Sequence, residues 1–270
     1  MISKLISNED FSVYNGENTI LRKAQLRMLE ILVQVSSICD KHAIPYWIDY
    51  GTLLGAVRHN GFIPWDDDLD ISILKKDYTK LSKVLQKELP LNLVFQNWKN
   101  EKKLTLKVTK IRDIYSYYDD GLTKRGETKH QGIFIDIFTI ENIPSIRIKR
   151  FIDFFYGRSF RRLRGLNTNK TEYFLSYVIW PWAILLAFIS RISSFLLKSH
   201  TLANIYGGLN LPVYHKKNDI FPLQKICFEG LEFSCPNNHQ KFLTSIYGDY
   251  MKIPPKEKRF THAKSIEFLD

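Results

Sequence analysis

The sequence predicts an α+β fold in which helices flank a mixed sheet. Helices are indicated by apolar residues that recur at helical spacing, as between Leu21 and Cys39. Strands are indicated by short runs rich in β-branched and aromatic residues, with clear alternation over residues 103–118. The chain has 270 residues, 44% hydrophobic and 25% charged, which is enough to bury a sizeable core. This composition argues against disordered, collagen-like and coiled-coil proteins.

Helices and strands follow one another over the first 143 residues. The expected order is a helix over 19–41 that Pro45 ends, a short strand over 44–50, a turn and short helix over 51–61 closed by Gly61, a strand in the second half of 66–74, an amphipathic helix over 75–89, and strands over 91–98, 103–118 and 131–144. Such a mixture indicates an α/β or α+β core. Short strands over 220–236 and a helix over 237–250 follow later in the chain.

The chain divides into three parts by composition. Residues 1–145 form the predicted core, residues 146–215 are basic and apolar together, and residues 216–270 return to a mixed pattern. The middle part holds an apolar stretch, 174–190, which is at the lower length limit for spanning a bilayer. Four arginines between residues 158 and 164 precede it. We therefore rank docking in a membrane interface first, a buried helix pair second and a spanning helix third.

The charge and the cysteines limit the partner and the compartment. The chain carries 39 Lys and Arg against 28 Asp and Glu, a formal net charge of +11, which predicts an anionic partner. It has no RNP segment or zinc-finger pattern, so nucleic acid is disfavoured as that partner. Cys39, Cys227 and Cys235 form neither a disulfide framework nor a CxxC zinc pattern, and we expect no secretory signal. A reducing, cytoplasmic compartment is therefore expected.

Four aspartates crowd residues 66–70, next to an alternating apolar run. On a strand, Asp68 and Asp70 would share one face, Asp66 would join them if the strand extends that far, and Asp67 would point away. Carboxylates at this spacing repel one another unless a cation lies between them, and Mg²⁺ (or Mn²⁺) is the natural neutraliser. We favour this metal site over a solvated acidic loop, because apolar residues alternate with the acids.

Two other kinds of metal site have a similar acidic pattern. An EF-hand loop counted from Asp66 would need Gly at its sixth position, where Ile71 stands, and we reject it. The DxD pair of metal-dependent glycosyltransferases also holds a nucleotide-sugar diphosphate through a metal. The acidic pair by itself does not exclude that class.

A third acid and a candidate phosphate-binding turn accompany this cluster. Asp136 lies inside an apolar run, where an acid needs a partner, either a core Arg or Lys or a metal shared with the first acids. We favour the metal, because an open pair of acids already exists. Gly51 and Thr52 stand between a strand and a helix, where free N–H groups suit a phosphate. These groups together suit in-line displacement at phosphorus.

The run WIDYGTLLGAVRHNGFIPWDDDLDISI, residues 47–73, closely resembles the signature of the LicD family. The resemblance continues in GIFIDIF around Asp136, FP at 221–222, FEG at 228–230, YGDYM at 247–251 and PPKEKR at 254–259. It spans about residues 20–262 and weakens across 146–215. The resemblance implies a nucleotidyltransferase-like mixed sheet flanked by helices, with a catalytic core over 1–145, a basic and apolar helical insertion over 146–215, and a last part over 216–270 that packs on the core.

The resemblance also implies a reaction. It is the metal-dependent transfer of phosphocholine from CDP-choline to a sugar hydroxyl of a lipid-linked cell-surface glycan, of teichoic acid or lipopolysaccharide type, with release of CMP. Related members transfer ribitol phosphate, so another phospho-alcohol is the alternative. Carried over position by position, the residues are Asp68 and Asp70 as the metal pair, Asp136 as the third acid, Gly51 and Thr52 as the phosphate turn, and Asp66 as the first acid of the run. Such an enzyme would work in the cytoplasm at the inner face of the plasma membrane.

Basic and aromatic residues near these motifs are further candidates. Those for holding the charge of the departing CMP are Arg58, Lys107 and Arg112, with a solvated strand face as the alternative for the last two. His59 would contact substrate or be structural. Trp47, Tyr50 and Trp65 would pack in the core or enclose a quaternary ammonium group, and core packing is favoured for Trp47.

Two other function classes are kept beside the phosphotransferase. A DxD glycosyltransferase lacks support from the spacing between the Gly-Thr turn and the acids and from the third acid. A non-catalytic membrane-surface binding protein would leave the acids without a role.

Overall fold

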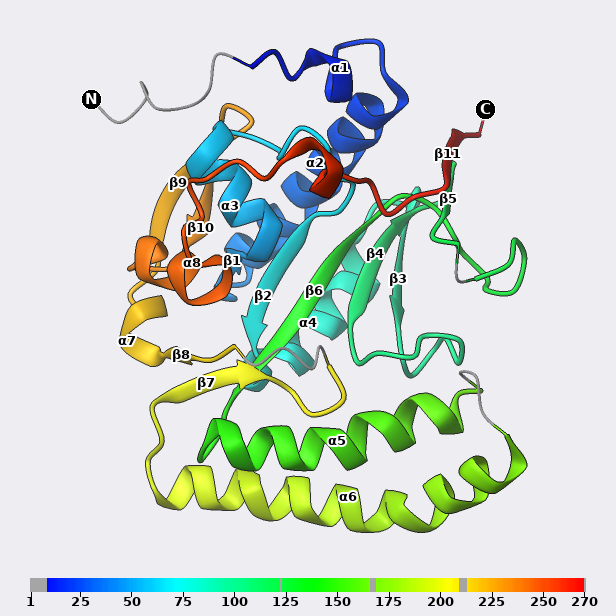
Figure 1. Ribbon diagram of the computed structural model, residues 1–270, viewed down its shortest axis with the longest axis vertical. Coiled ribbons are helices and arrows are strands. Elements are labelled where there is room, and N and C mark those ends of the chain that lie inside the picture. The colour runs from blue at the N-terminus through cyan, green and yellow to red at the C-terminus, as the bar shows by residue number, and fades with distance from the viewer. Residues whose placement is uncertain (1–8, 122, 166–168, 209–212, 270) are drawn as a thin grey trace.

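The computed structural model describes residues 9–121, 123–165, 169–208 and 213–269. Its centre is a seven-stranded mixed sheet (Figure 1). The strands are β1 (Tyr46–Ile48), β2 (Asp70–Leu74), β6 (Phe134–Asn142), β4 (Thr109–Asp113) and β3 (Leu93–Asn97) in spatial order, with β7 (Thr201–Asn204) on β6 and β8 (His215–Lys216) on β7. The pair β2 and β6 is parallel and the other pairs are antiparallel. The expected mixed sheet flanked by helices is confirmed.

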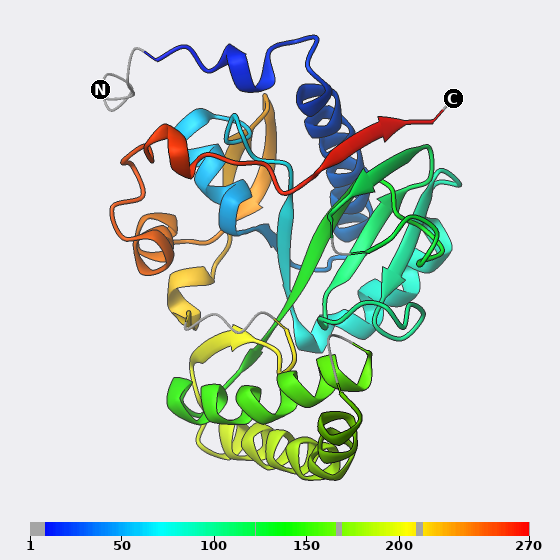
Figure 2. The same ribbon diagram turned by 45° about the vertical axis from the view of Figure 1, so that its right-hand side comes forward.

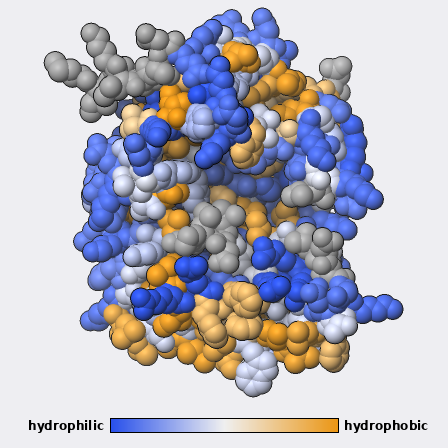
Figure 3. Space-filling model, in the orientation of Figure 1, coloured by the Kyte–Doolittle hydropathy of each residue, from blue (hydrophilic) through white to orange (hydrophobic). Residues whose placement is uncertain are grey.

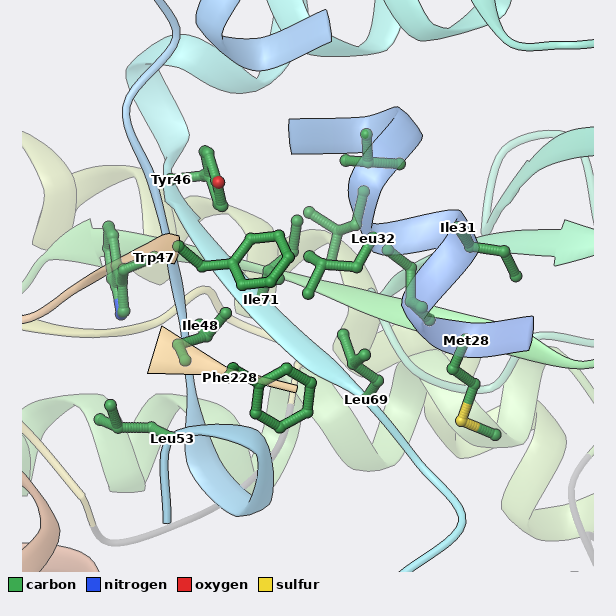
Figure 4. Close-up of a cluster of buried hydrophobic side chains, with 14 of the residues drawn as sticks. Met28, Ile31, Leu32, Tyr46, Trp47, Ile48, Leu53, Leu69, Ile71 and Phe228 are labelled. Carbon is green, nitrogen blue, oxygen red and sulfur yellow. The ribbon is translucent and has the colours of Figure 1, made fainter. Parts of the chain in front are cut away.

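Two long helices cover the sheet and bury its main core. These are α2 (Ile20–Lys41) and α4 (Lys75–Glu88), which contact each other and strand β6. Helix α2 begins at Thr19, whose hydroxyl accepts a hydrogen bond from the Arg22 N–H, a common N-cap. Figure 4 shows the resulting cluster, in which Met28 and Leu32 of α2 meet residues of β1 and β2. The helix predicted over residues 19–41 is confirmed.

The last part of the chain packs beside β1 and then returns across the sheet. It contains α7 (Lys217–Ile220), the hairpin β9 (Gln224–Phe228) and β10 (Leu231–Cys235), and α8 (His239–Tyr247). A 3₁₀ turn, η1 (Lys256–Lys258), leads to β11 (Ser265–Phe268), which pairs with β5 (Ser116–Asp119). Figure 2 shows this C-terminal stretch crossing near the start of β2. A short helix, α1 (Ser12–Asn15), and α3 (Tyr50–His59) complete the fold.

A helical hairpin lies along one end of the molecule (Figures 1 and 2). It consists of α5 (Ile146–Leu163) and α6 (Lys170–Leu196), which pack along each other around a small core of their own. After α6 the chain returns to the central sheet as β7, opposite residues 140–142 of β6. The predicted basic and apolar helical region is therefore inserted between two neighbouring strands.

Two local expectations are wrong. The strand expected over 103–118 forms only at Thr109–Asp113 and Ser116–Asp119, so Lys107 precedes the strand. The physical reason is that the guanidinium of Arg164 donates hydrogen bonds to backbone carbonyls between residues 98 and 104, which holds that segment off the sheet. Helix α3 is closed by Asn60 in the left-handed region (φ 56°) instead of by Gly61.

Candidate active site

The parallel pairing of β2 and β6 brings two acids from distant sequence positions together. Asp70, the first residue of β2, is the register partner of Asp136 on β6. Side chains of register partners on neighbouring strands share one face of a sheet. Asp66 and Asp68 precede the strand, which begins at Asp70 and not two or four residues earlier. The site is therefore built partly on a rigid strand and partly on the loop that enters it.

The carboxyl groups of this cluster lie next to one another, with Asp70 buried and Asp66, Asp68 and Asp136 half-buried. Burial, followed by repulsion from Asp68 and Asp136, holds the pKa of Asp70 well above its usual range. Burial and repulsion from Asp68 and Asp67 do the same to the pKa of Asp66. Burial also raises the pKa of Asp68. These carboxyls are costly to ionise in the protein alone, which is the electrostatic state that a divalent cation relieves.

Asp67 turns its carboxylate toward the C-terminal stretch of the chain, while one of its oxygen atoms stays within 4.8 Å of Asp66. Its carboxylate accepts hydrogen bonds from the backbone N–H groups of His262 (2.9 Å) and Ala263 (2.6 Å) and from the Tyr118 hydroxyl (2.9 Å). Burial opposes ionisation of Asp67, but these hydrogen bonds outweigh it and lower the pKa of the carboxyl. Asp67 therefore fastens the C-terminal stretch over the start of β2.

One group of three ligating side chains is closely spaced in the described ranges. Ligand atoms of Asp66, Asp67 and His262 lie within 4.8 Å of one another. Its hydrogen bond to Asp67 raises the pKa of His262 to about 9, so the imidazole is cationic at neutral pH and pairs with the acid. His262 and Asp67 form an ion pair here, and within the described ranges the expected ligands Asp68, Asp70 and Asp136 do not form so tight a group.

The start of α3 lies directly against the acids. A Cβ atom on Gly51 would stand 2.8 Å from the Asp66 Oδ2 atom and 3.8 Å from the Asp68 Oδ1 atom, so this position accepts no side chain without movement. The Thr52 hydroxyl accepts a hydrogen bond from the Asp70 N–H at 2.8 Å. Asp49 caps the helix by accepting from the Tyr50 N–H at 2.7 Å. The predicted turn therefore holds the first residue of β2 and leaves space only for small groups beside Asp66.

Asp136 has a cationic partner that the sequence reading did not name. The Lys110 Nζ atom lies 2.7 Å from Oδ1 and 2.9 Å from Oδ2 of Asp136, and the two residues are register partners on β4 and β6. The core salt bridge and the place opposite Asp70 are therefore both present. Burial lowers the pKa of Lys110, against the attraction of Asp136. Register between the two strands is the signal that identifies Lys110, and that register was not available from sequence.

The two basic candidates of the first motif, Arg58 and His59, make contacts with the protein itself. Arg58 is buried and donates to the Tyr250 carbonyl at 2.9 Å, so it fastens the segment after α8. The Arg58 Nε–H also contacts the His59 Nε2 atom at 2.9 Å. Burial, with the positive charge of Arg58, lowers the pKa of His59 to about 4, and the ring packs edge-on against Phe11 and Trp65. The structure thus gives both residues contacts typical of a structural role.

The two basic candidates near β4 are also held by structural contacts. The Lys107 ammonium reaches the Tyr156 hydroxyl of α5 and lies over that ring, between the sheet and the hairpin. Arg112 is buried and donates to the Gln96 Oε1 atom (2.6 Å) and the Gly132 carbonyl (2.7 Å). These contacts do not fit a solvated strand face, because each side chain donates at least one hydrogen bond to a protein acceptor.

A pocket of about 440 Å³ opens beside the acids on the face of the sheet. Its lining includes Asp136 and Lys110, the apolar side chains of Phe138 and Val108, and Arg164 from the end of α5. A larger hollow of about 490 Å³ lies against α4 and β3 and contains no predicted site residue. The pocket beside Asp136 is therefore the natural place for a substrate.

The aromatic candidates separate into core and pocket residues. Trp47 is fully buried and Trp65 nearly so, and both belong to the main core, so the core packing expected of Trp47 is confirmed. Tyr50 packs edge-on against Phe138, which lines the pocket. Tyr247 of α8 lies close to the acids as well, since burial and then the charges of Asp70 and Asp49 raise its pKa. Tyr247 lies in the YGDYM match but was not singled out from sequence.

Comparison with known proteins agrees with this geometry. Residues 43–162 match the family described as LicD/FKTN/FKRP, nucleotidyltransferase domain. The chain is 27% identical to the lipopolysaccharide cholinephosphotransferase LicD of Haemophilus influenzae, over 90% of this chain and 95% of that protein. Shorter matches are to human ribitol 5-phosphate transferase FKRP, 42% identical over 16% of this chain and 9% of that protein, and to human ribitol-5-phosphate transferase FKTN, 32% identical over 25% and 15%.

The domain match covers the turn at Gly51, the aspartate run and Asp136, and the longer match extends over both flanking parts of the chain. Residues 43–162 therefore carry a domain that matches the LicD/FKTN/FKRP family, and the chain is a phosphotransferase.

Proposed function

We propose that the protein transfers phosphocholine from CDP-choline to a sugar hydroxyl of a lipid-linked cell-surface glycan, of teichoic acid or lipopolysaccharide type, and releases CMP. The observation that carries this proposal is the register pairing of Asp70 with Asp136, beside Asp66, Asp68 and the side-chain-free position Gly51. A relative that aligns with this chain over 95% of its length is a cholinephosphotransferase. The same support favours a nucleotidyltransferase-like fold, as the domain description suggests.

The residues present fit a hard divalent cation, Mg²⁺ or Mn²⁺. The candidate ligands Asp68, Asp70 and Asp136 offer only oxygen atoms, and burial raises the pKa of both Asp68 and Asp70. When bound, the cation would neutralise these carboxylates together with the diphosphate of the donor. We propose Asp68 and Asp70 as the main pair and Asp136 as the third acid.

The protein's own groups supply the proton transfer and the orientation. We assign to Asp136 the acceptance of the proton from the sugar hydroxyl, while that oxygen forms its bond to the choline-bearing phosphorus and the bond from phosphorus to CMP breaks. Lys110 holds Asp136 in position through contacts to both of its carboxylate oxygens. Gly51 and Thr52 place the start of α3 against the acids, where its N–H groups would be available to the departing phosphate.

Choline is the preferred alcohol, and ribitol is the second candidate. The observation that favours ribitol is the similarity to ribitol 5-phosphate transferases. This similarity covers only a short segment of the chain, so choline is preferred. The test is incubation of the purified protein with CDP-choline, CDP-ribitol and other CDP-alcohols, with CMP release as the readout. We expect release from CDP-choline that depends on Mg²⁺ and on Asp70. Release from a sugar nucleotide in place of every CDP-alcohol would overturn the proposal in favour of a glycosyltransferase.

We further propose that the enzyme works in the cytoplasm at the inner face of the plasma membrane, because a lipid-linked acceptor is found there. The division into a catalytic core over 1–145, an insertion over 146–215 and a final part over 216–270 is proposed on the same basis. The helix Lys170–Leu196 is long and apolar enough to cross a membrane by length and composition.

A further inference from the structure

The hairpin of α5 and α6 exposes large apolar side chains over its outer surface. On α6, Phe174 is 70% exposed, Trp182 65% and Phe195 83%. On α5, Phe151 and Phe154 are exposed at positions one helical turn apart. Figure 3 shows the resulting apolar band along the end of the molecule that the hairpin forms. A surface this apolar on a water-soluble body marks an interaction site.

The side chains that α6 does bury are small. Ser176, Ala183, Ala187, Ser190 and Ser194 are its buried residues. Their spacing of three, four and seven places them on one stripe of the helix, which faces the protein. Only 22% of the most apolar window of α6 is buried inside the protein. Because α6 turns its large apolar residues outward, the reading of a buried core helix does not fit.

Contacts at both ends of the hairpin hold it to the catalytic body. Near the C-terminal end of α6, Arg191 pairs with Glu141 of β6 at 2.8 Å, and Lys75 of α4 pairs with the same carboxylate at 2.8 Å. At the opposite end, Arg164 binds backbone carbonyls between residues 98 and 104, and Arg162 pairs with Glu172 of α6. The C-terminal end of α6 is thus bound to the body directly and its N-terminal end through α5, which favours a helix that lies along the body over one whose ends stand on two sides of a bilayer.

Basic residues surround the apolar surface. Residues 146–200 carry ten Lys and Arg against two acids, which is most of the surplus charge of the chain. The exposed ones stand at both ends of the hairpin and along α5, at Arg147, Arg150, Arg158, Lys170 and Lys198. An exposed apolar face bordered by cations is complementary to the interface of an anionic bilayer, where apolar side chains reach the acyl region and cations meet headgroup phosphates.

We propose that this surface docks into the interface of an anionic lipid bilayer, with α5 and α6 lying parallel to the membrane plane. The purpose of this docking rests on the function proposed above, because docking would bring a membrane-anchored acceptor next to the acids. The pocket that holds Asp136 ends at Arg164 of the hairpin. A second hollow of about 430 Å³, lined by Phe160, Leu163 and Trp180, shares Arg164 and Lys103 with it. The two neighbouring hollows therefore lie between the hairpin and Asp136.

The first test is flotation of the full chain with vesicles of phosphatidylcholine alone or with about 30% phosphatidylglycerol. We expect flotation with the anionic vesicles, and at least about a tenfold loss for the double variant Trp182→Glu and Phe188→Glu, whose side chains are exposed. The matched control is Leu91→Glu, which removes an apolar side chain that is 97% exposed at a site away from the hairpin, and which should float like the wild type.

The second test measures depth along α6. A fluorescent probe is placed on single cysteines at Phe174, Trp182 and Phe195, in a Cys227→Ser background because Cys227 is the exposed native thiol of the described residues. Quenching by lipids brominated at different depths should report the same shallow depth at all three positions. A deep probe at Trp182 between shallow probes at the two ends would show a spanning helix and overturn the parallel placement.

The remaining outcomes also decide the matter. Absence of flotation for the wild type overturns membrane docking. A concentration-dependent dimer that the double variant abolishes, without vesicle binding, would assign the surface to a second copy of the chain. CMP release from a water-soluble donor should be the same in the double variant and the wild type. If neither the wild type nor the double variant released CMP while the wild type still floated with the vesicles, the proposed function would be contradicted and the docking proposal would stand.

Discussion

Helices α2 and α6 bury opposite kinds of residue. Helix α2 buries large apolar side chains such as Met28, Ile31 and Leu32, whereas α6 buries only serines and alanines and exposes its large ones. The region around β2 differs in charge as well, since the loop before the strand and the sheet together gather Asp66, Asp68, Asp70 and Asp136, while the hairpin gathers cations. The two regions are therefore suited to different surroundings. The sheet is suited to a cation and a diphosphate in water, and the hairpin to a lipid surface.

The largest expected effect lies in the acidic site. Asp70→Asn should reduce CMP release by on the order of 10³-fold, because it removes a ligand or electrostatic partner of the reacting phosphate. The variant should nevertheless be at least as stable as the wild type without metal, since burial and its acidic neighbours oppose the charge of Asp70. Activity assays and thermal unfolding of both proteins test this. Substantial retained activity would remove Asp70 from the site.

The next effect separates Lys110 from the residues named from sequence. Lys110→Met should lower kcat by about 10²-fold, because the Asp136 carboxylate loses the ammonium group that holds it in position. Lys110→Arg should restore part of the rate. An unchanged kcat, together with a lower melting temperature, would show that Lys110 is only structural.

A pair of glycine substitutions compares the two regions directly. Gly51→Ala should cost about 1–3 kcal/mol of unfolding free energy, because the new Cβ meets the Asp66 carboxylate at 2.8 Å. Gly157→Ala on α5 meets no atom closer than 4.0 Å and should be neutral or stabilising by up to about 1 kcal/mol. Denaturant unfolding of the two variants gives both values. Equal costs would contradict the tight approach of α3 to the acids.

The smallest expected effect is on the pH dependence of stability. Asp66, Asp68 and Asp70 have pKa values raised by burial and mutual repulsion, so the folded protein binds their protons more tightly than the unfolded chain does. Their contribution is present below the unfolded carboxyl pKa and is lost as pH rises through the folded values. Mg²⁺ should therefore raise the melting temperature more at pH 8 than at pH 5, by a few degrees. In the control variant Asp70→Asn, Mg²⁺ should raise the melting temperature equally at pH 8 and pH 5.

Much of the site could be predicted from the sequence, because its pattern is local. The alternation of acids with apolar residues predicted a separate direction for Asp67, whose carboxylate accepts hydrogen bonds from His262 and Ala263. Asp70 and Asp136 were placed on neighbouring strands, which the register confirms. The roles expected of Arg58, Lys107 and Arg112 stay predictions, and the contacts that hold these side chains could not be predicted, since their partners come from parts of the chain that local sequence does not connect.

The sequence by itself determined the helices, the acidic run and the concentration of base and apolar residues after Ile146, because spacing and composition act over a few residues. Only the tertiary structure decided that Lys110 faces Asp136, because strand register depends on pairings between distant segments. It also decided that α6 turns its small residues inward and is held to one body at both ends. An apolar stretch reads alike whether it spans, docks or fills a core, and its contacts with the rest of the fold distinguish these cases.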